Sequence, residues 1–182
     1  MKIATALMLA ASLAAPVLAE RTKTEVVKAT TPEQDAKENS DSVPNVYAIP
    51  AQIKNVLILR FKYKADLLAG IEEMVKKHKI RNAVFLSGVG SVRNSHIHGV
   101  SNRTFPSKNM FVKDDSNPAD IISINGYVIE GRVHAHMTLA DDEKAFGGHI
   151  EPGNPVFTFA IVTLGILEDN VTLDKVDDKT YR

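Results

Sequence analysis

Residues 131–141 of this chain read Gly131-Arg132-Val133-His134-Ala135-His136-Met137-Thr138-Leu139-Ala140-Asp141. Apolar and polar side chains alternate along this stretch, and a period of two is typical of a β-strand with one buried face. The side chains that would turn to the core are Val133, Ala135, Met137 and Leu139. His134 and His136 would lie on the opposite face, about 7 Å apart along the strand.

A third histidine follows in Gly147-Gly148-His149. We expect these glycines to turn the chain with positive φ and to return His149, on a loop, to the histidine strand. Three neutral imidazoles are a common ligand set for a divalent transition metal. Zinc is the first choice because it accepts imidazole and leaves a fourth position for water, although copper, nickel or iron could use the same ligands. The alternative is a hydrogen-bonded polar cluster without metal.

Other residues could support such a site. Asp141 is either a partner that fixes an imidazole tautomer or a plain turn residue. Glu151 or Asp141 could accept a proton if the metal activates water. We expect His96 and His98 to be exposed or at an interface, unless the fold brings them beside the first three histidines.

A short glycine-containing segment, Gly88-Val89-Gly90-Ser91, lacks the lysine and the spacing of a P-loop and predicts a tight turn after a strand. The backbone amides at Gly88 and Gly90 could line a pocket for an anion, with Arg60 and Arg132 as nearby cations. A structural salt bridge is the alternative role for each arginine.

Periodicity outward from the histidine strand predicts an α+β domain with a largely antiparallel sheet and one main amphipathic helix. The helix spans 66–78, and its Gly70 suggests close packing. We expect a polar loop over 104–119. The predicted strands span 56–63, 83–86, 95–100, 121–129, 132–139 and 156–167, and residues 171–176 close the domain.

The N-terminus reads as a secretory signal. A lysine, an apolar run and small residues at the cleavage site occupy residues 1–19, which predicts cleavage between Ala19 and Glu20 and a periplasmic or secreted protein. Residues 20–45 are polar and predict a flexible tether, which leaves 46–182 as the folded domain. No later run is apolar enough to cross a membrane.

Composition excludes several classes of function. The 182 residues contain no cysteine, so disulfides and thiolate metal sites are absent. Removal of the signal would leave 21 basic and 22 acidic residues. Such a balance lacks the strong positive field that binds a phosphate backbone, and we expect no nucleic-acid partner.

Several segments in order resemble the plants-and-prokaryotes-conserved (PPC) domain, in particular bacterial single-domain members related to the AT-hook proteins of plants. The resemblance covers roughly residues 56–178. The matching pieces are Leu59-Arg60-Phe61, residues 86–92, residues 131–141, Gly147-Gly148-His149 and the strand over 156–164.

This resemblance implies a compact α+β domain that assembles as a homotrimer. Some prokaryotic members resemble metal-binding proteins, which implies His134, His136 and His149 as ligands here. Bacterial members are often labelled DNA-binding, but this chain has no Arg-Gly-Arg-Pro hook and carries the export pattern. We therefore expect an exported metal-binding domain, with zinc and a small ligand at the three histidines. A DNA-binding protein and a structural trimer without metal are the alternatives, and whether the domain is an enzyme stays open.

Overall fold

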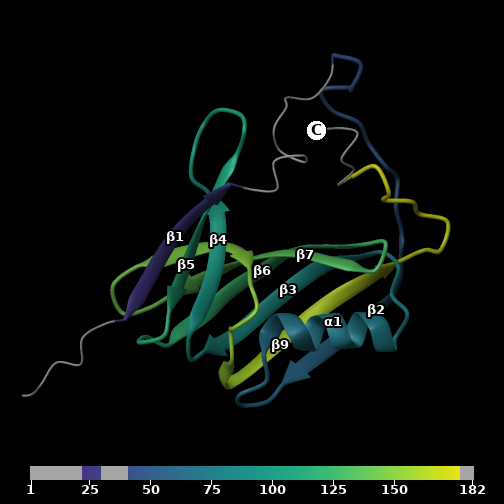
Figure 1. Ribbon diagram of the computed structural model, residues 1–182. Coiled ribbons are helices and arrows are strands. Elements are labelled where there is room, and N and C mark those ends of the chain that lie inside the picture. The colour runs from purple at the N-terminus through teal and green to yellow at the C-terminus, as the bar shows by residue number, and fades with distance from the viewer. Residues whose placement is uncertain (1–21, 30–40, 177–182) are drawn as a thin grey trace, which may run out of the picture.

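The computed structural model describes residues 22–29 and 41–176, which form one antiparallel sheet of nine strands and a single α-helix (Figure 1). The strands are β1 (Lys23–Ala29), β2 (Ile53–Phe61), β3 (Ala83–Val92), β4 (Ser95–Val100), β5 (Lys108–Asp114), β6 (Ala119–Ile129), β7 (Arg132–Ala140), β8 (Ala145–Ile150) and β9 (Val156–Leu167). Helix α1 spans Leu67–Lys77. The predicted fold class, α+β with an antiparallel sheet and one helix, is confirmed.

The order of the strands is β1-β5-β4-β8-β7-β6-β3-β9-β2, so the histidine strand β7 lies near the middle of the sheet. Strands β6 and β7 are joined by the two-residue turn Glu130-Gly131, whose φ angles of 49° and 78° are both positive. Turns of this kind match the twist of a hairpin. The turn therefore sets the register that places His134 opposite Tyr127.

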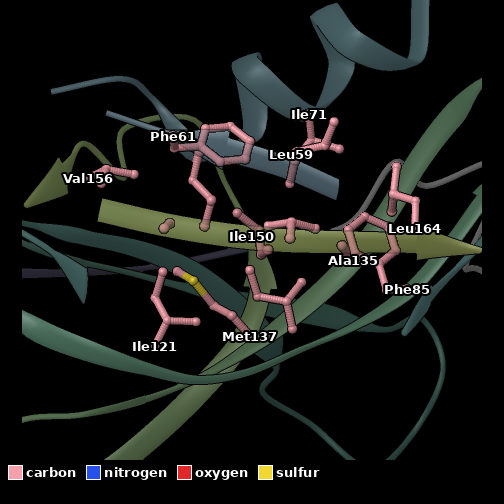
Figure 2. Close-up of a cluster of buried hydrophobic side chains, with 14 of the residues drawn as sticks. Leu59, Phe61, Ile71, Phe85, Ile121, Ala135, Met137, Ile150, Val156 and Leu164 are labelled. Carbon is pink, nitrogen blue, oxygen red and sulfur yellow. The ribbon is translucent and has the colours of Figure 1, made fainter. Parts of the chain in front are cut away.

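Helix α1 begins where the sequence predicts it. The Asp66 side chain caps the helix by accepting a hydrogen bond from the backbone N–H of Ala69, and His78 is the C-cap. The apolar stripe of the helix buries Leu67, Ile71 and Val75. Figure 2 shows Ile71 above the sheet side chains that it covers, among them Leu59, Ala135 and Leu164.

Gly70 is needed for this packing. A Cβ atom at Gly70 would lie 2.4 Å from Cε1 of Phe61 on β2, which is far inside van der Waals contact. The absence of a side chain lets the helix approach the sheet closely, and this confirms the expectation drawn from the sequence.

The sheet has two distinct faces. The face under α1 carries the main apolar core, including the predicted Ala135, Met137 and Leu139 of β7. We call the opposite side the outer face, and the histidines of β7 lie on it. The strands β2, β3 and β9 expose apolar side chains there, a set that we call the apolar patch: Val56, Ile58, Leu86, Val89, Phe157 and Phe159.

Two predictions about irregular segments are wrong. The sequence predicts a flexible tether over 20–45, but residues Lys23–Ala29 form β1, and the loop predicted over 104–119 contains β5. These two strands pair with each other, and β5 also pairs with β4. Every residue of β1 is exposed, so backbone hydrogen bonds and not apolar burial hold the strand in the sheet. A prediction of disorder from polar composition therefore misses it.

Strand boundaries also differ from the prediction. Residues 87–91 do not form a turn, because β3 continues to Val92 with bulges in its pairing to β9. Residues 171–176 contain no strand. The signal segment and its cleavage site lie outside the described residues. Within the described part of the chain, no helix is long and apolar enough to span a membrane.

Candidate metal centre

The three histidines singled out by the sequence come together on the outer face. His134 and His136 project from β7, with ring centroids 5.6 Å apart and nearly parallel planes. His149 lies directly opposite His136 in the β7–β8 pairing. Its ring centroid is 5.0 Å from that of His134 and 5.2 Å from that of His136, and it meets both nearly edge-on.

The ring nitrogens of this trio converge. One ligand nitrogen from each of His134, His136 and His149 lies within 4.8 Å of the other two. A zinc ion bound at the usual length holds tetrahedral ligand nitrogens about 3.4 Å apart. Small side-chain rotations suffice to close that gap, so the arrangement fits a divalent ion.

His149 reaches this position from a strand and not from a loop, which corrects the sequence prediction. Neither Gly147 nor Gly148 is among the described glycines with positive φ, and both lie within β8. A Cβ atom at Gly148 would lie 2.4 Å from the carbonyl oxygen of His98, and one at Gly147 would lie 2.3 Å from that of Met137. The glycines therefore allow β8 to fit between β4 and β7.

His98 extends the cluster on the far side of β8. It lies opposite His149 in the β4–β8 pairing, and the two ring centroids are 4.5 Å apart. The His98 ring also packs against Phe111 of β5, with centroids 4.9 Å apart. Of the two outcomes left open for His98, the structure shows the one in which the fold brings it beside the trio.

Glu151 completes a second group of possible ligands. Its Oε1 is 2.5 Å from Nδ1 of His98, and one ligand atom each of His98, His149 and Glu151 lies within 4.8 Å of the others. The two groups share His149. His96 stays outside both, because its Nδ1 donates to the carbonyl oxygen of Pro152 at 2.7 Å.

The loop that carries Glu151 is fixed by a buried residue that the sequence analysis does not identify, Asn154. Its side chain accepts a hydrogen bond from the backbone N–H of His96 at 2.8 Å and donates to the carbonyl oxygens of His96 and Glu151. Asp66, the N-cap of α1, accepts from the backbone N–H of Asn154. One hydrogen-bond network therefore links β4, the Glu151 loop and the helix.

The surroundings of His136 favour its neutral form. The groups packed around the His136 ring desolvate it and so lower its pKa below the ordinary value of 6.5, and the neighbouring charges of His134 and His98 lower this pKa further. Each of these causes disfavours the imidazolium. A metal binds only the neutral ring, so the surroundings of His136 favour coordination near neutral pH.

The remaining predicted residues lie elsewhere. Asp141 takes the turn role, because its Oδ1 accepts from the backbone N–H groups of Glu143 and Lys144 in the β7–β8 turn. Arg60 is on the edge strand β2, several strands from β7, and Arg132 lines a pocket beside α1 with Glu72 and Lys76. Arg60 is therefore remote from the histidine cluster, whereas Arg132 lies two residues before His134 on β7.

The alternative for Gly88 and Gly90, a pocket for an anion at their backbone amides, finds no support in the packing of these residues. A Cβ atom at Gly88 would lie 2.4 Å from Cβ of Ile124, and one at Gly90 would lie 2.3 Å from the carbonyl oxygen of Phe159. These glycines serve close packing of β3 against its neighbours, which leaves no space at their α-carbons for an anion.

Comparison with known proteins identifies relatives of this fold. The family model described as the Plants and Prokaryotes Conserved (PCC) domain matches residues 49–168. No curated protein is similar enough to the chain to count as a match.

Several solved structures share the fold, among them the following three. A metal-containing protein from Archaeoglobus fulgidus has 23% sequence identity and a TM-score of 0.57, over 69% of this chain and 89% of its own. A hypothetical protein from Salmonella cholerae-suis has 20% identity and a TM-score of 0.54, over 66% and 81%. A plant- and prokaryote-conserved protein from Pyrococcus horikoshii has 21% identity and a TM-score of 0.52, over 69% and 87%.

Proposed function

We propose that this chain, which belongs to the Plants and Prokaryotes Conserved (PPC) domain family, binds one divalent transition-metal ion through His134, His136 and His149. The observation that carries the proposal is the convergence of three imidazoles from two adjacent strands, with ligand nitrogens within 4.8 Å of one another. The similar fold of a metal-containing archaeal protein gives further support.

Zinc is the metal that the donor set favours. Three imidazoles and one open position form a common zinc environment, and zinc needs no further protein ligand. Copper, nickel and iron also accept imidazole, so the metal content of the protein decides among them. When bound, zinc would supply a Lewis acid and lower the pKa of a bound water.

The site is open to a small ligand. His136 is exposed on the outer face, whereas His134 and His149 are half-buried. An ion held from one side by two strands keeps at least one coordination position turned to solvent. We assign this position to a small molecule that coordinates the metal, without assigning a reaction.

His98 and Glu151 support the ligand His149. The carboxylate of Glu151 holds Nδ1 of His98, which fixes the orientation of the His98 ring that stacks beside His149. Partners of this kind tune metal sites without binding the ion. Of the two carboxylates that the sequence offers as proton acceptors, Glu151 lies at the cluster, whereas Asp141 is committed to the turn.

Metal analysis tests the proposal. The full chain is expressed with zinc, purified without chelators and analysed by inductively coupled plasma mass spectrometry, beside His136→Ala and the control His96→Ala. We expect about one zinc per chain in the wild type and in the control, and loss of it in His136→Ala. Absence of stoichiometric metal from the folded wild type would refute the proposal.

Assembly and export belong to the same proposal. The apolar patch on β2, β3 and β9 offers a surface through which copies could associate, and large exposed apolar patches mark such interfaces. We propose a homotrimer, which light scattering with size-exclusion chromatography would distinguish from a monomer. Export to the periplasm or medium predicts a mature N-terminus at Glu20, which N-terminal sequencing of the cell fractions would detect.

The balanced charge gives a nucleic-acid role no support. The chain has 22 basic and 22 acidic residues, whereas proteins that bind DNA through its phosphates carry a positive surface.

A further inference from the structure

An apolar pocket lies beside the histidines on the outer face. It has a volume of about 680 Å³ and is formed where residues 44–53 and the segment after β9 cover one end of the sheet. Its walls include Tyr47, Ile49, Val84, Tyr127 and Leu173. A hydrogen bond from the Tyr47 hydroxyl to the carbonyl oxygen of Lys175 links the two covering segments.

The pocket and the candidate metal centre are adjacent. Tyr127 of β6 lines the pocket and is paired directly with His134 of β7. Residues paired in this way point to the same face, with Cβ atoms about 5 Å apart. One side chain therefore separates the apolar walls from the first imidazole of the trio.

The surroundings of the pocket indicate what fits it. Its volume lies within the range of small-molecule sites, which extends from about 300 to 1,000 Å³. The side chains that form it are mostly aliphatic or aromatic, and several are exposed although they are large and apolar: Val46, Tyr47, Ile53, Tyr127 and Val176. Such a surface favours an apolar group that removes it from water.

We propose that the pocket holds the apolar body of a small organic anion whose head binds the metal at His134, His136 and His149. The occupant has two parts: an aromatic or branched aliphatic body, and a carboxylate or hydroxamate-like head with oxygen donors. This inference rests on the proposed metal site and adds the class of ligand. The direct pairing of the pocket residue Tyr127 with His134 favours one molecule that reaches both the pocket and the histidines.

A series of three probes tests the inference by isothermal titration of the full chain after zinc addition. Acetohydroxamate carries the head alone, 4-phenylbutyramide carries the body alone, and 4-phenylbutyrohydroxamate carries both. We expect the last to bind on the order of tenfold or more tightly than either of the others, because only it gains both the metal bond and apolar burial.

A matched pair of variants places the body of the probe. Ile53→Asn changes a residue of the pocket wall that is 47% exposed. Ile122→Asn changes an isoleucine outside the pocket that is 55% exposed. We expect Ile53→Asn to weaken the phenyl probe by about threefold or more without changing acetohydroxamate, and Ile122→Asn to change neither.

The failures are distinguishable. Equal affinities for the two hydroxamates in zinc-bound protein would overturn the ligand class and leave the metal site standing, as would equal effects of the two variants. Equal affinities of the amide and the phenyl hydroxamate would overturn the link to the metal. Failure of the wild type to bind zinc would overturn both the metal site and this inference.

Discussion

His136 and His149 lie directly opposite each other on β7 and β8, and their rings meet nearly edge-on with centroids 5.2 Å apart. This cross-strand pairing brings His149 beside the two histidines of β7, so that the three rings form a candidate metal site. The ring of His134, two residues before His136 on β7, also lies next to that of His149, and the ring of His98 on β4 lies on the other side of His149. The pairing of β4, β8 and β7 therefore determines whether the four rings come together.

Replacement of Gly148 by alanine should destabilise the protein by about 1–3 kcal/mol, because the new Cβ would clash with the carbonyl oxygen of His98. The free energy of unfolding in urea measures the effect. Gly99→Ala is a matched control in the neighbouring strand β4, since a Cβ atom there meets nothing within 4 Å. Equal stability of the two variants would show that β8 is not tightly fitted against β4.

Loss of the Asn154 side chain should also destabilise the fold. Asn154→Ala leaves the backbone N–H of His96 and the carbonyl oxygen of Glu151 without their hydrogen-bond partner, whereas the carbonyl oxygen of His96 keeps the bond from the backbone N–H of Glu151. A buried group without a partner costs roughly 1–3 kcal/mol, so a total loss of about 2 kcal/mol or more is expected. Thermal unfolding of this variant is compared with that of Asn170→Ala, an exposed residue after β9. A change no larger than the control's would contradict the proposed network.

Neutralisation of Glu151 should weaken metal binding without abolishing it. Glu151→Gln removes the carboxylate that holds the His98 ring, and loss of such a partner commonly costs 10- to 100-fold in metal affinity. Competition with a chromophoric chelator measures the zinc affinity, and Glu73→Gln on the exposed side of α1 is the control. Unchanged affinity in Glu151→Gln would remove Glu151 and His98 from the support of the site.

The metal-free protein should lose stability as the pH falls below 6.5. The pKa of His136 is lowered in the folded state, so between that pKa and 6.5 the unfolded chain binds a proton that the folded chain does not. Protonation therefore favours the unfolded chain, and stability from this residue is complete only above pH 6.5. Histidine NMR signals should give a midpoint for His136 below 6.5, and His136→Asn should reduce the fall in melting temperature. A midpoint at or above 6.5 would contradict the proposed environment.

The sequence predicts the local elements of this structure better than their pairing. Alternation along residues 132–139 identifies both faces of β7, and the apolar stripe of 66–78 identifies α1 with its cap at Asp66. These patterns are visible because each element has one buried face. Strand β1 has none, since its seven residues are all exposed, and it is held by the edge of β5.

The candidate site is only half visible in the sequence for the same reason. The spacing of His134 and His136 predicts that they lie on the same face of a strand, whereas the positions of His98 and Glu151 depend on how β4 pairs with β8. That pairing joins segments about fifty residues apart. A second His-x-His pattern at His96 and His98 was the available signal, but only the register shows that His98, and not His96, faces His149.

The position of a bound zinc ion in a crystal would show whether His134, His136 and His149 form the metal site. Crystals of zinc-bound protein, with diffraction measured on both sides of the zinc absorption edge, give an anomalous difference map that marks the ion. We expect one strong peak per chain, about 2.1 Å from a ring nitrogen of each of His134, His136 and His149. A peak bonded to other residues, with these three rings unligated, would contradict the proposed metal site.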